Sequence, residues 1–368
     1  MRKSLKFAPV LALGLVLASC SGSTSSVQTE SRSTPVQVAS DVNAVAAGNG
    51  HSMFLKSDNT LWVMGDNTYG QLGDGTTENR LSPVQVASAV TAASAGVHHS
   101  MFLKSDNTLW AMGNNEQGQL GDGTTTGRLT PVQVASDVTA VEVGDYHSMF
   151  LKSDNTLWAV GWNVSGQLGD GTTTDRLTPV QVASEVTAVS AGSLHSMFLK
   201  SDNTLWATGN NASGQLGNGT TESRLTPVQV ASDVTAVSAG DGHSMFLKSD
   251  KTLWAMGWTE YGQLPDGTTE SRLSPIQVAS DVTAVSAGSF HSMFLKSDNT
   301  LWGAGDNESG QLGDGTTESR LTPVLVASAV TSVAAGGGHS VFLKSDNTLW
   351  GAGWDGFGQL GDGTTENR

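Results

Sequence analysis

The sequence predicts an all-β fold, a seven-bladed propeller whose blades are four-stranded antiparallel sheets. The first observation is a repeat of 48 residues, marked by the histidines His51, His99, His147, His195, His243, His291 and His339. The second is that a tryptophan keeps the same interval. The third is that no unit has an apolar pattern with a period of 3.6, which argues against a helical repeat. Units of this length that stack on their neighbours are typical of propellers, whereas a β-helix needs far fewer residues per rung.

Each unit contains four strand candidates, shown here for one unit. Residues 186–191 are rich in valine and small side chains, 195–200 and 204–209 are apolar on both sides, and 227–230 begins with proline. Proline suits the first position of a strand because no ladder donor is lost there. The Ser-Asp-Asn-Thr of residues 201–204 has turn chemistry, so the two middle strands should form a hairpin. Strands that are apolar on both sides predict sheets that stack on one another.

The positions within the repeat at which the first and last units begin and end predict that the ring closes. Residues 33–368 make seven units of 48 residues with none left over. Thr34 to Val38 has the sequence of the strand that would follow Arg368. We expect this N-terminal strand to complete the last blade, which would remove an exposed sheet edge.

Residues 1–32 are not predicted to belong to the ring. Three basic residues precede an apolar run, which is the layout of a secretory signal and is too short to cross a membrane. The run ends in Leu-Ala-Ser-Cys, which resembles the lipobox of bacterial lipoproteins with Cys20 as the lipidated residue. We expect a lipoprotein signal at 1–19, a Ser-rich tether at 20–32 and the propeller at 33–368. The expected location is the bacterial cell envelope, at the outer membrane or cell surface; without lipid on Cys20 the protein would be secreted.

The chain is acidic. It has 34 aspartates and glutamates against 19 lysines and arginines, a formal net charge of −15. Such a balance repels phosphate backbones and anionic lipid surfaces. Nucleic acid is therefore not an expected partner, and contact with a membrane is expected only through the lipid on Cys20.

The phrase GQLGDGTT, followed by a proline-led strand and by VTAVSAGxxHSMFLKSDNTLWAMG, resembles the repeat of the regulator of chromosome condensation family. The resemblance spans all seven units and implies a seven-bladed propeller. Function does not follow from a fold alone. The eukaryotic member implies a guanine-nucleotide exchange-type regulator, by analogy only. The secreted β-lactamase-inhibiting propeller of bacteria is nearer in compartment and implies protein binding by one face. Pro265 and Asn218 depart from the repeat, which argues against a metal site in every blade.

Two short windows differ from unit to unit, while the other positions barely change. One window precedes the repeated histidine, as in Asp145-Tyr146, and the other follows the fourth strand candidate, as in residues 162–165. In an antiparallel meander the one connection between these windows lies at the opposite end of the sheet. Both windows are therefore predicted to lie on a single rim. Loops that a rigid scaffold presents are where binding usually resides.

The residue types in these windows are those of a binding surface. Rigid aromatic side chains offer contact area at low entropic cost, and the charges there are all acidic. The predicted ligand-binding residues are Tyr69, His98, Tyr146, Trp162, Trp258, Tyr261, Phe290, Trp354, Phe357, Asp66, Asp145, Asp241 and Asp355. We expect a monomeric, lipid-anchored module that binds a basic or neutral protein, with a carbohydrate as the alternative ligand. The alternative is sequence drift in weakly constrained loops, with aromatic side chains that pack only on their own rim, which would give the same pattern.

No catalytic, metal or cofactor site is predicted. The repeated histidines are interpreted as hydrogen-bonding groups between blades rather than as a metal ring or a proton relay. His98 lies outside the repeat and has no nearby cysteine or spaced carboxylate, so it is interpreted as a rim residue. The Ser-Asp-Asn-Thr-Leu-Trp phrase is similar to the aspartate box of sialidases but lacks its glycine. Without a nucleophile elbow, a phosphate loop or a singular carboxylate pair, an enzyme is not expected.

Overall fold

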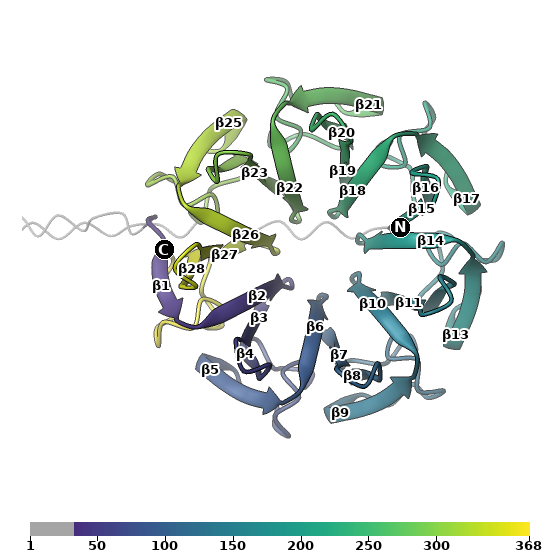
Figure 1. Cartoon of the computed structure of the whole chain (residues 1–368), viewed down its shortest axis with the longest axis horizontal. Helices are drawn as coiled ribbons and strands as arrows, with labels where there is room; N and C mark the ends of the chain where they lie inside the picture. Colours follow the sequence, from purple (N-terminus) through teal and green to yellow (C-terminus); the bar gives the residue numbers. More distant parts are fainter. Residues whose placement is uncertain (1–32) are drawn as a thin grey trace, which may run out of the picture. The chain divides into compact units, whose positions relative to one another are not determined.

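The computed structural model describes residues 33–368, which form a ring of seven four-stranded blades (Figure 1). Every blade is an antiparallel meander, so the predicted fold class is confirmed. The predicted signal, the tether and Cys20 lie outside the described residues. Residues 33–368 contain no helix that is long and apolar enough to span a membrane.

The strands fall into four classes by their position from the axis outward. The innermost are β2 Val42–Ala47, β6 Val90–Ala95, β10 Val138–Val143, β14 Val186–Ala191, β18 Val234–Ala239, β22 Val282–Ala287 and β26 Val330–Ala335. The second class, which begins at the repeated histidine, is β3 His51–Lys56, β7 His99–Lys104, β11 His147–Lys152, β15 His195–Lys200, β19 His243–Lys248, β23 His291–Lys296 and β27 His339–Lys344.

The third class carries the repeated tryptophan: β4 Leu61–Gly65, β8 Leu109–Gly113, β12 Leu157–Gly161, β16 Leu205–Gly209, β20 Leu253–Gly257, β24 Leu301–Gly305 and β28 Leu349–Gly353. The outer class is β5 Arg80–Ala87, β9 Arg128–Ala135, β13 Arg176–Ala183, β17 Arg224–Ala231, β21 Arg272–Ala279, β25 Arg320–Ala327 and β1 Val36–Ala39. Blade 1 is β2–β5, and the blades follow in chain order to blade 7, which is β26, β27, β28 and β1.

The outer strand is longer than the sequence predicts. It begins at Arg224 rather than Pro227, because Arg224 pairs with Gly209 across an irregular register. Conversely, the third strand begins one residue later than predicted. Thr204 belongs to the turn, where its backbone N–H and hydroxyl both donate to the carboxylate of Asp202, at 3.0 and 2.6 Å.

The ring closes as predicted. β1 pairs antiparallel with β28, with Val36 opposite Gly351. Arg368 exchanges backbone hydrogen bonds with Gly353, at 2.6 and 2.9 Å. The outer strand of blade 7 is thus supplied by both ends of the ring-forming chain, and β1 and the C-terminus lie beside each other in Figure 1.

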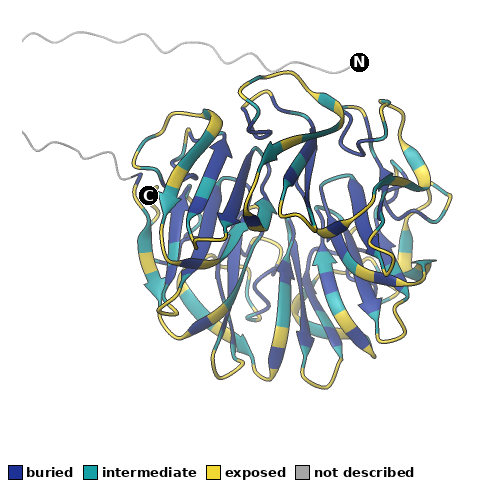
Figure 2. Ribbon diagram, turned by 45° about the horizontal axis from the view of Figure 1, so that its top comes forward, coloured by how far each residue is buried: buried dark blue, intermediate teal, exposed yellow. Residues whose placement is uncertain are grey.

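The core lies between blades rather than inside any one of them. In one cluster, Met149 and Leu157 of blade 3 pack with Phe198 and Val186 of blade 4, and all four side chains are buried. Equivalent clusters join the other neighbouring blades. Figure 2 shows the two middle strands of the blades mostly buried, the innermost strands largely half-buried, and most exposed residues in the loops and outer strands. Burial on both faces of each sheet explains why the middle strands are apolar on both sides.

A ring of buried histidine–serine contacts also joins the blades, and we call it the histidine belt. Nε2 of each repeated histidine lies 2.7 to 2.9 Å from Oγ of the serine one position after the histidine of the next blade. The belt closes from His339 to Ser52. Ser196 donates its own proton to the carbonyl of Gln167, so it accepts from Nε2–H of His147. The predicted structural role of the histidines is confirmed.

Burial keeps the histidine belt uncharged. It lowers the pKa of each of the seven imidazoles, to about 3 or about 4. Their Nδ1 atoms are buried and have no partner among residues 33–368. A proton placed on such a ring would therefore be a buried charge without compensation, which is costly.

Candidate binding face

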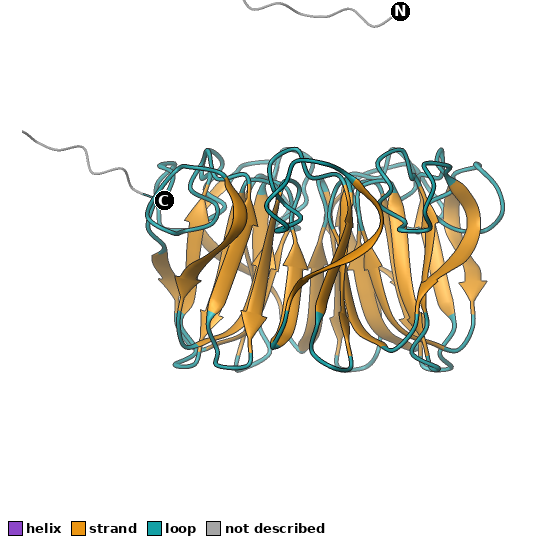
Figure 3. Cartoon of the chain, turned by 90° about the horizontal axis from the view of Figure 1, so that it is seen from above, coloured by secondary structure: helices purple, strands orange, loops and turns teal. Residues whose placement is uncertain are grey.

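The variable face is the rim on which two connections of every blade meet: the loop before the histidine strand and the loop after the third strand. A backbone hydrogen bond ties the two loops together, as from Trp162 N to Tyr146 O at 2.9 Å. Both variable windows therefore lie on one rim, as the meander predicts, and this is the side of the longer loops in Figure 3. The Ser-Asp-Asn-Thr turns, which differ only by Lys251 in blade 5, lie at the other end, where Ser153 N donates to Asp137 O at 2.8 Å.

A row of rings crosses the variable face over blades 1 to 3. The ring centroids of Tyr69 and His98 are 4.5 Å apart, and those of His98 and Tyr146 are 6.4 Å apart. Tyr146 meets Trp162 edge to face, with centroids 5.6 Å apart. Tyr69, at 41% exposure, is the open end of the row. The four predicted residues form one continuous aromatic cluster.

A second group of rings lies on blades 5 and 6. Trp258, Tyr261 and Phe290 contact one another, with centroids 5.6 to 5.7 Å apart. On blade 7, Trp354 and Phe357 form a pair at 4.8 Å. All the predicted aromatic residues thus lie on the variable face, in three groups rather than in one continuous surface.

The structure corrects the prediction for two of the four acids, Asp66 and Asp355, which are buried. Asp66 accepts hydrogen bonds from the N–H and hydroxyl of Thr68, at 3.0 and 2.6 Å, and from Nε2 of Gln71 at 2.8 Å. Asp355 accepts from Leu360 N at 2.8 Å. Because these carboxylates are enclosed by their own loops, they are not available to a ligand.

Three tryptophans occupy, in other blades, the position that Asp66 has in the repeat of blade 1. Blades 2, 4 and 6 carry Asn114, Asn210 and Asp306 there, and each accepts from the Nε2 of the glutamine five residues later. Blades 3, 5 and 7 carry Trp162, Trp258 and Trp354, which have no acceptor to offer. The matching amide nitrogens of Gln167, Gln263 and Gln359 are buried and have no partner in residues 33–368. Each tryptophan therefore costs its blade a buried hydrogen bond, about 1 kcal/mol or more.

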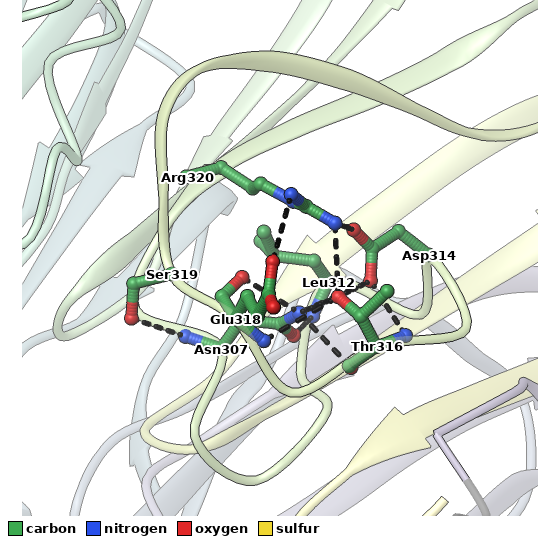
Figure 4. Close-up of polar contacts among 7 residues, drawn as sticks. All are labelled: Asn307, Leu312, Asp314, Thr316, Glu318, Ser319 and Arg320. Atoms are coloured by element: carbon green, nitrogen blue, oxygen red, sulfur yellow. Dashed lines mark hydrogen bonds and ion pairs between the residues drawn. The ribbon is translucent and has the colours of Figure 1, made fainter.

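The loops of the variable face rest on a repeated polar lattice, drawn for blade 6 in Figure 4. Nδ2 of Asn307 donates to Oδ1 of Asp314 at 3.1 Å and to the carbonyl of Thr316 at 3.1 Å. Asp314 also accepts from the hydroxyl of Thr316 at 2.7 Å and from Nε of Arg320 at 2.9 Å, and these bonds lower the pKa of the aspartate although its partial burial acts to raise it. Side chains on this face are thus carried by loops of defined geometry.

The other two predicted acids border a central channel of about 290 Å³. Asp145 and Asp241 are partly exposed at its mouth. Burial raises the pKa of Asp145, and it raises that of Asp241 to about 7, helped by the charge of Asp145. Ser193 donates its hydroxyl to Asp145 at 2.6 Å. The mouth of the channel therefore carries two carboxyl groups that lack a cationic partner.

Sequence reasoning missed Glu142, which lies deeper in the channel wall. It occupies the position of Ser190, Ser238 and Ser286 in other blades, and burial raises its pKa to about 7. The hydroxyl of Ser94 donates to its carboxylate at 3.5 Å. It is the one charged residue at that position of the repeat, and this was visible in the alignment of the units.

No group of three or more histidine, cysteine, aspartate or glutamate side chains is arranged to hold a metal ion within residues 33–368. His98 lies on the variable face, partly exposed, and burial lowers its pKa.

The comparison with known families decides what kind of propeller this is. A profile described as "RCC1-like domain" matches residues 137–368, which is more than half of the chain. The chain belongs to the RCC1-like domain family. Profiles of the regulator of chromosome condensation (RCC1) repeat also match residues 58–103 and 106–151, so the family assignment extends over the first blades of the RCC1-like ring.

Solved structures agree with the RCC1-like fold. Human WBSCR16 is 22% identical, with 87% of this chain and 88% of that chain covered and a TM-score of 0.74. Prp20p from Saccharomyces cerevisiae is 22% identical, with 86% and 84% covered and a TM-score of 0.74. The ectodomain of the Arabidopsis thaliana receptor kinase ACR4 is more distant, at 16% identity and a TM-score of 0.52 over 86% of this chain and 97% of that chain. No curated protein sequence matches the chain. At these identities the likeness establishes the fold.

Proposed function

We propose that this RCC1-like propeller is a binding module that recognises a protein through the aromatic clusters of its variable face. The observation that carries the proposal is the set of three tryptophans, Trp162, Trp258 and Trp354. Each replaces an asparagine or aspartate that satisfies a buried glutamine amide in other blades. A residue that removes a hydrogen bond from its own loop does not serve the stability of the fold, whereas contact with a partner accounts for its presence.

Two further observations favour a protein over a carbohydrate as the ligand. Most of the rings pack against one another edge to face, as Tyr146 does on Trp162, so they form contiguous aromatic clusters rather than separate flat platforms. Among relatives of this fold, Prp20p is described with binding properties to Gsp1p and histones, and Kap60 has been seen bound to it. The RCC1-like scaffold is thus suited to present a protein-binding rim. An exchange activity on a guanine-nucleotide-binding protein stays an analogy with the family.

The same proposal gives the chain no catalytic role and places it at the bacterial cell envelope through lipid on Cys20. Labelling cells with a palmitate analogue tests the anchor. The wild-type chain should carry the label and sediment with membranes, whereas Cys20→Ser should remove the label and release the protein. Label retained by Cys20→Ser would contradict the anchor without affecting the binding proposal.

The binding proposal is tested by changing the three tryptophans to asparagine, the residue found at that position in blades 2 and 4. The triple variant W162N/W258N/W354N should be at least as stable as the wild type, because each asparagine restores an acceptor for its glutamine. Capture of the partner from the native envelope should nevertheless fall at least tenfold, since rigid aromatic anchors dominate interface energies.

The matched control changes the opposite rim. Lys56, Lys152 and Lys248 each lie over a repeated tryptophan at 4.6 to 4.7 Å, and their replacement by alanine should leave capture unchanged. Equal capture by the wild type and the asparagine variant would refute the proposed face. Capture of glycans but not of proteins on matched arrays would replace the protein ligand with the carbohydrate alternative.

A further inference from the structure

A pocket of about 340 Å³ opens on the variable face, among loops of blades 1, 5, 6 and 7. Phe290 and Trp354 supply aromatic rings to its lining, and Asp241 and Asp306 supply carboxyl groups. Its volume is at the lower end of the range for ligand pockets, roughly 300 to 1,000 Å³, and suits one side chain or a small molecule.

Blade 7 leaves room for the pocket because it has a pair of glycines before its histidine. Other blades carry larger pairs in this window, such as Ser289-Phe290 in blade 6. A Cβ on Gly337 would lie 2.7 Å from the carbonyl oxygen of Asn49, which is closer than real contacts allow. The glycine pair therefore lets blades 7 and 1 approach closely without filling the space beside Trp354.

The pocket holds two carboxyl groups with no cation to balance them. Asp306 accepts from Nε2 of Gln311 at 2.8 Å and from Glu308 N at 3.1 Å, and both donors are neutral. Asp241 accepts a hydrogen bond from the hydroxyl of Ser289, and the charge of another acid, Asp145, helps to raise its pKa. No lysine or arginine lines the pocket. A cation entering it would favour the ionised form of these carboxyl groups, and its attraction to a partly desolvated carboxylate is stronger than in bulk water.

We propose that this pocket binds the guanidinium group of an arginine side chain on the protein partner. A guanidinium is planar and weakly hydrated, so it can stack on an aromatic ring while its N–H groups donate to a carboxylate. The pocket offers both kinds of contact, with Trp354 and Phe290 as rings and Asp241 and Asp306 as acceptors. An ammonium lacks the planar fork and should bind more weakly. The inference rests on the proposed function, because it names the chemistry by which that same face recognises its partner.

The repeat itself supplies substitutions that should not disturb the fold. Asparagine occupies the position of Asp306 in blades 2 and 4, and serine occupies the position of Asp241 in blades 4 and 6. The double variant D241S/D306N therefore removes both carboxylates with residues that the scaffold already accommodates. Asp66→Asn is the matched control, since it makes the same change as Asp306→Asn at a buried position outside the pocket.

The experiment titrates the ¹⁵N-labelled chain with N-acetyl-arginine amide and compares it with the citrulline and lysine analogues by NMR. The arginine probe should shift the amides of Gly337 and Gly338 and the indole of Trp354, with a dissociation constant of about 1 to 10 mM. Citrulline, the neutral isostere, should bind at least tenfold more weakly, and lysine should lie between them. D241S/D306N should weaken arginine binding at least tenfold, and Asp66→Asn less than twofold.

Equal binding of citrulline and arginine, or unchanged arginine binding in D241S/D306N, would overturn the guanidinium site. This failure can be told apart from failure of the proposed function. If the tryptophan-to-asparagine variant still loses the partner while arginine does not bind, the face recognises its partner without this pocket. If that variant captures the partner as the wild type does, the proposed function fails, and arginine binding no longer describes partner recognition.

Discussion

The histidine belt and the variable face adjoin along the chain, yet one is the same in every blade and the other differs in each. His99 and His98 show the contrast between neighbouring residues. His99 is buried and contacts Ser148 of the next blade at 2.8 Å. His98 is partly exposed, and its ring lies against Tyr69. A belt contact survives duplication because both of its partners are copied with the unit, whereas a rim side chain needs no copied partner and is free to diverge.

Acid should produce the largest effect, because it acts on the whole belt at once. The seven histidines have folded pKa values of about 3 to 4 against about 6.5 when unfolded, so below pH 6.5 the unfolded chain binds protons that the folded ring does not. Stability is therefore lost as pH falls from 6.5 toward 4. Glu142, Asp241 and Asp355, whose pKa values are raised to about 7, act in the opposite direction over about pH 4 to 7, and Asp145, whose pKa burial also raises, acts with them.

The net expectation is a fall of roughly 4 kcal/mol per pH unit near pH 5, since seven histidines less four carboxyl groups leave about three unmatched protons, each of which contributes about 1.4 kcal/mol per unit. Urea unfolding at pH 7, 6 and 5 measures it. A midpoint that does not move between pH 7 and 5 would show that the belt is not buried and neutral as described.

A substitution in the histidine belt should lower the free energy of unfolding more than the same substitution one residue away on the variable face. His99→Ala removes a fully buried ring and leaves a cavity, so it should lower the free energy of unfolding by about 2 to 4 kcal/mol. His98→Ala removes a rim contact with Tyr69 and should cost less than about 1 kcal/mol. Chemical denaturation of the two variants compares them directly, and equal losses would erase the distinction between belt and face.

Asp355→Asn should stabilise blade 7. Asparagine holds this position in most other blades, where it donates to the neighbouring aspartate, as Asn307 does to Asp314. Asp355 instead faces the carboxyl of Asp362, and burial together with that neighbour raises its pKa to about 7. The gain should be about 1 to 3 kcal/mol at pH 8 and smaller at pH 5, where the carboxyl is already protonated. Melting temperatures at the two pH values check this, with Asn307→Asp as the mirror variant that should lose stability.

The smallest effect should come from Asn218→Asp in blade 4. Nε of Arg224 is buried without a partner in the described ring, while Arg320 at the same position of blade 6 donates to Asp314 at 2.9 Å. Restoring the aspartate should add about 0.2 to 1 kcal/mol, because Arg224 is partly exposed to solvent. Thermal unfolding at low and high salt measures the gain, which should shrink as salt rises. A variant less stable than the wild type would count against the repeated ion pair.

The sequence predicts the scaffold well because each blade is specified by contacts that recur. The interval of His195, the turn at 201–204 and the phase of Thr34 to Val38 were enough to predict the meander and the closing strand. Strand ends were less accurate, as at Arg224, because pairing with Gly209 depends on a bulge that leaves no pattern in the residues.

The site was predicted less completely, because burial within a loop depends on hydrogen bonds that spacing does not reveal. The prediction groups Asp66 and Asp355 with the ligand-binding acids, although asparagine holds the position of Asp355 in five other blades and asparagine or aspartate holds the position of Asp66 in three. Such a pattern indicates a loop acceptor or donor rather than a contact residue. The hydrogen bond that Trp162 removes from its loop could not be predicted either, since only the structure shows that the amide of Gln167 has no partner in the described ring.

The closing strand also decides how the ring responds to mechanical load. A pull on the chain ahead of residue 33 reaches the ring at β1, whose only ladder partner is β28. Tension would separate β1 from β28 before it strained any other blade. The pairing of these two strands would therefore be the first contact to break, and the rate at which it opens would set the force that the ring withstands.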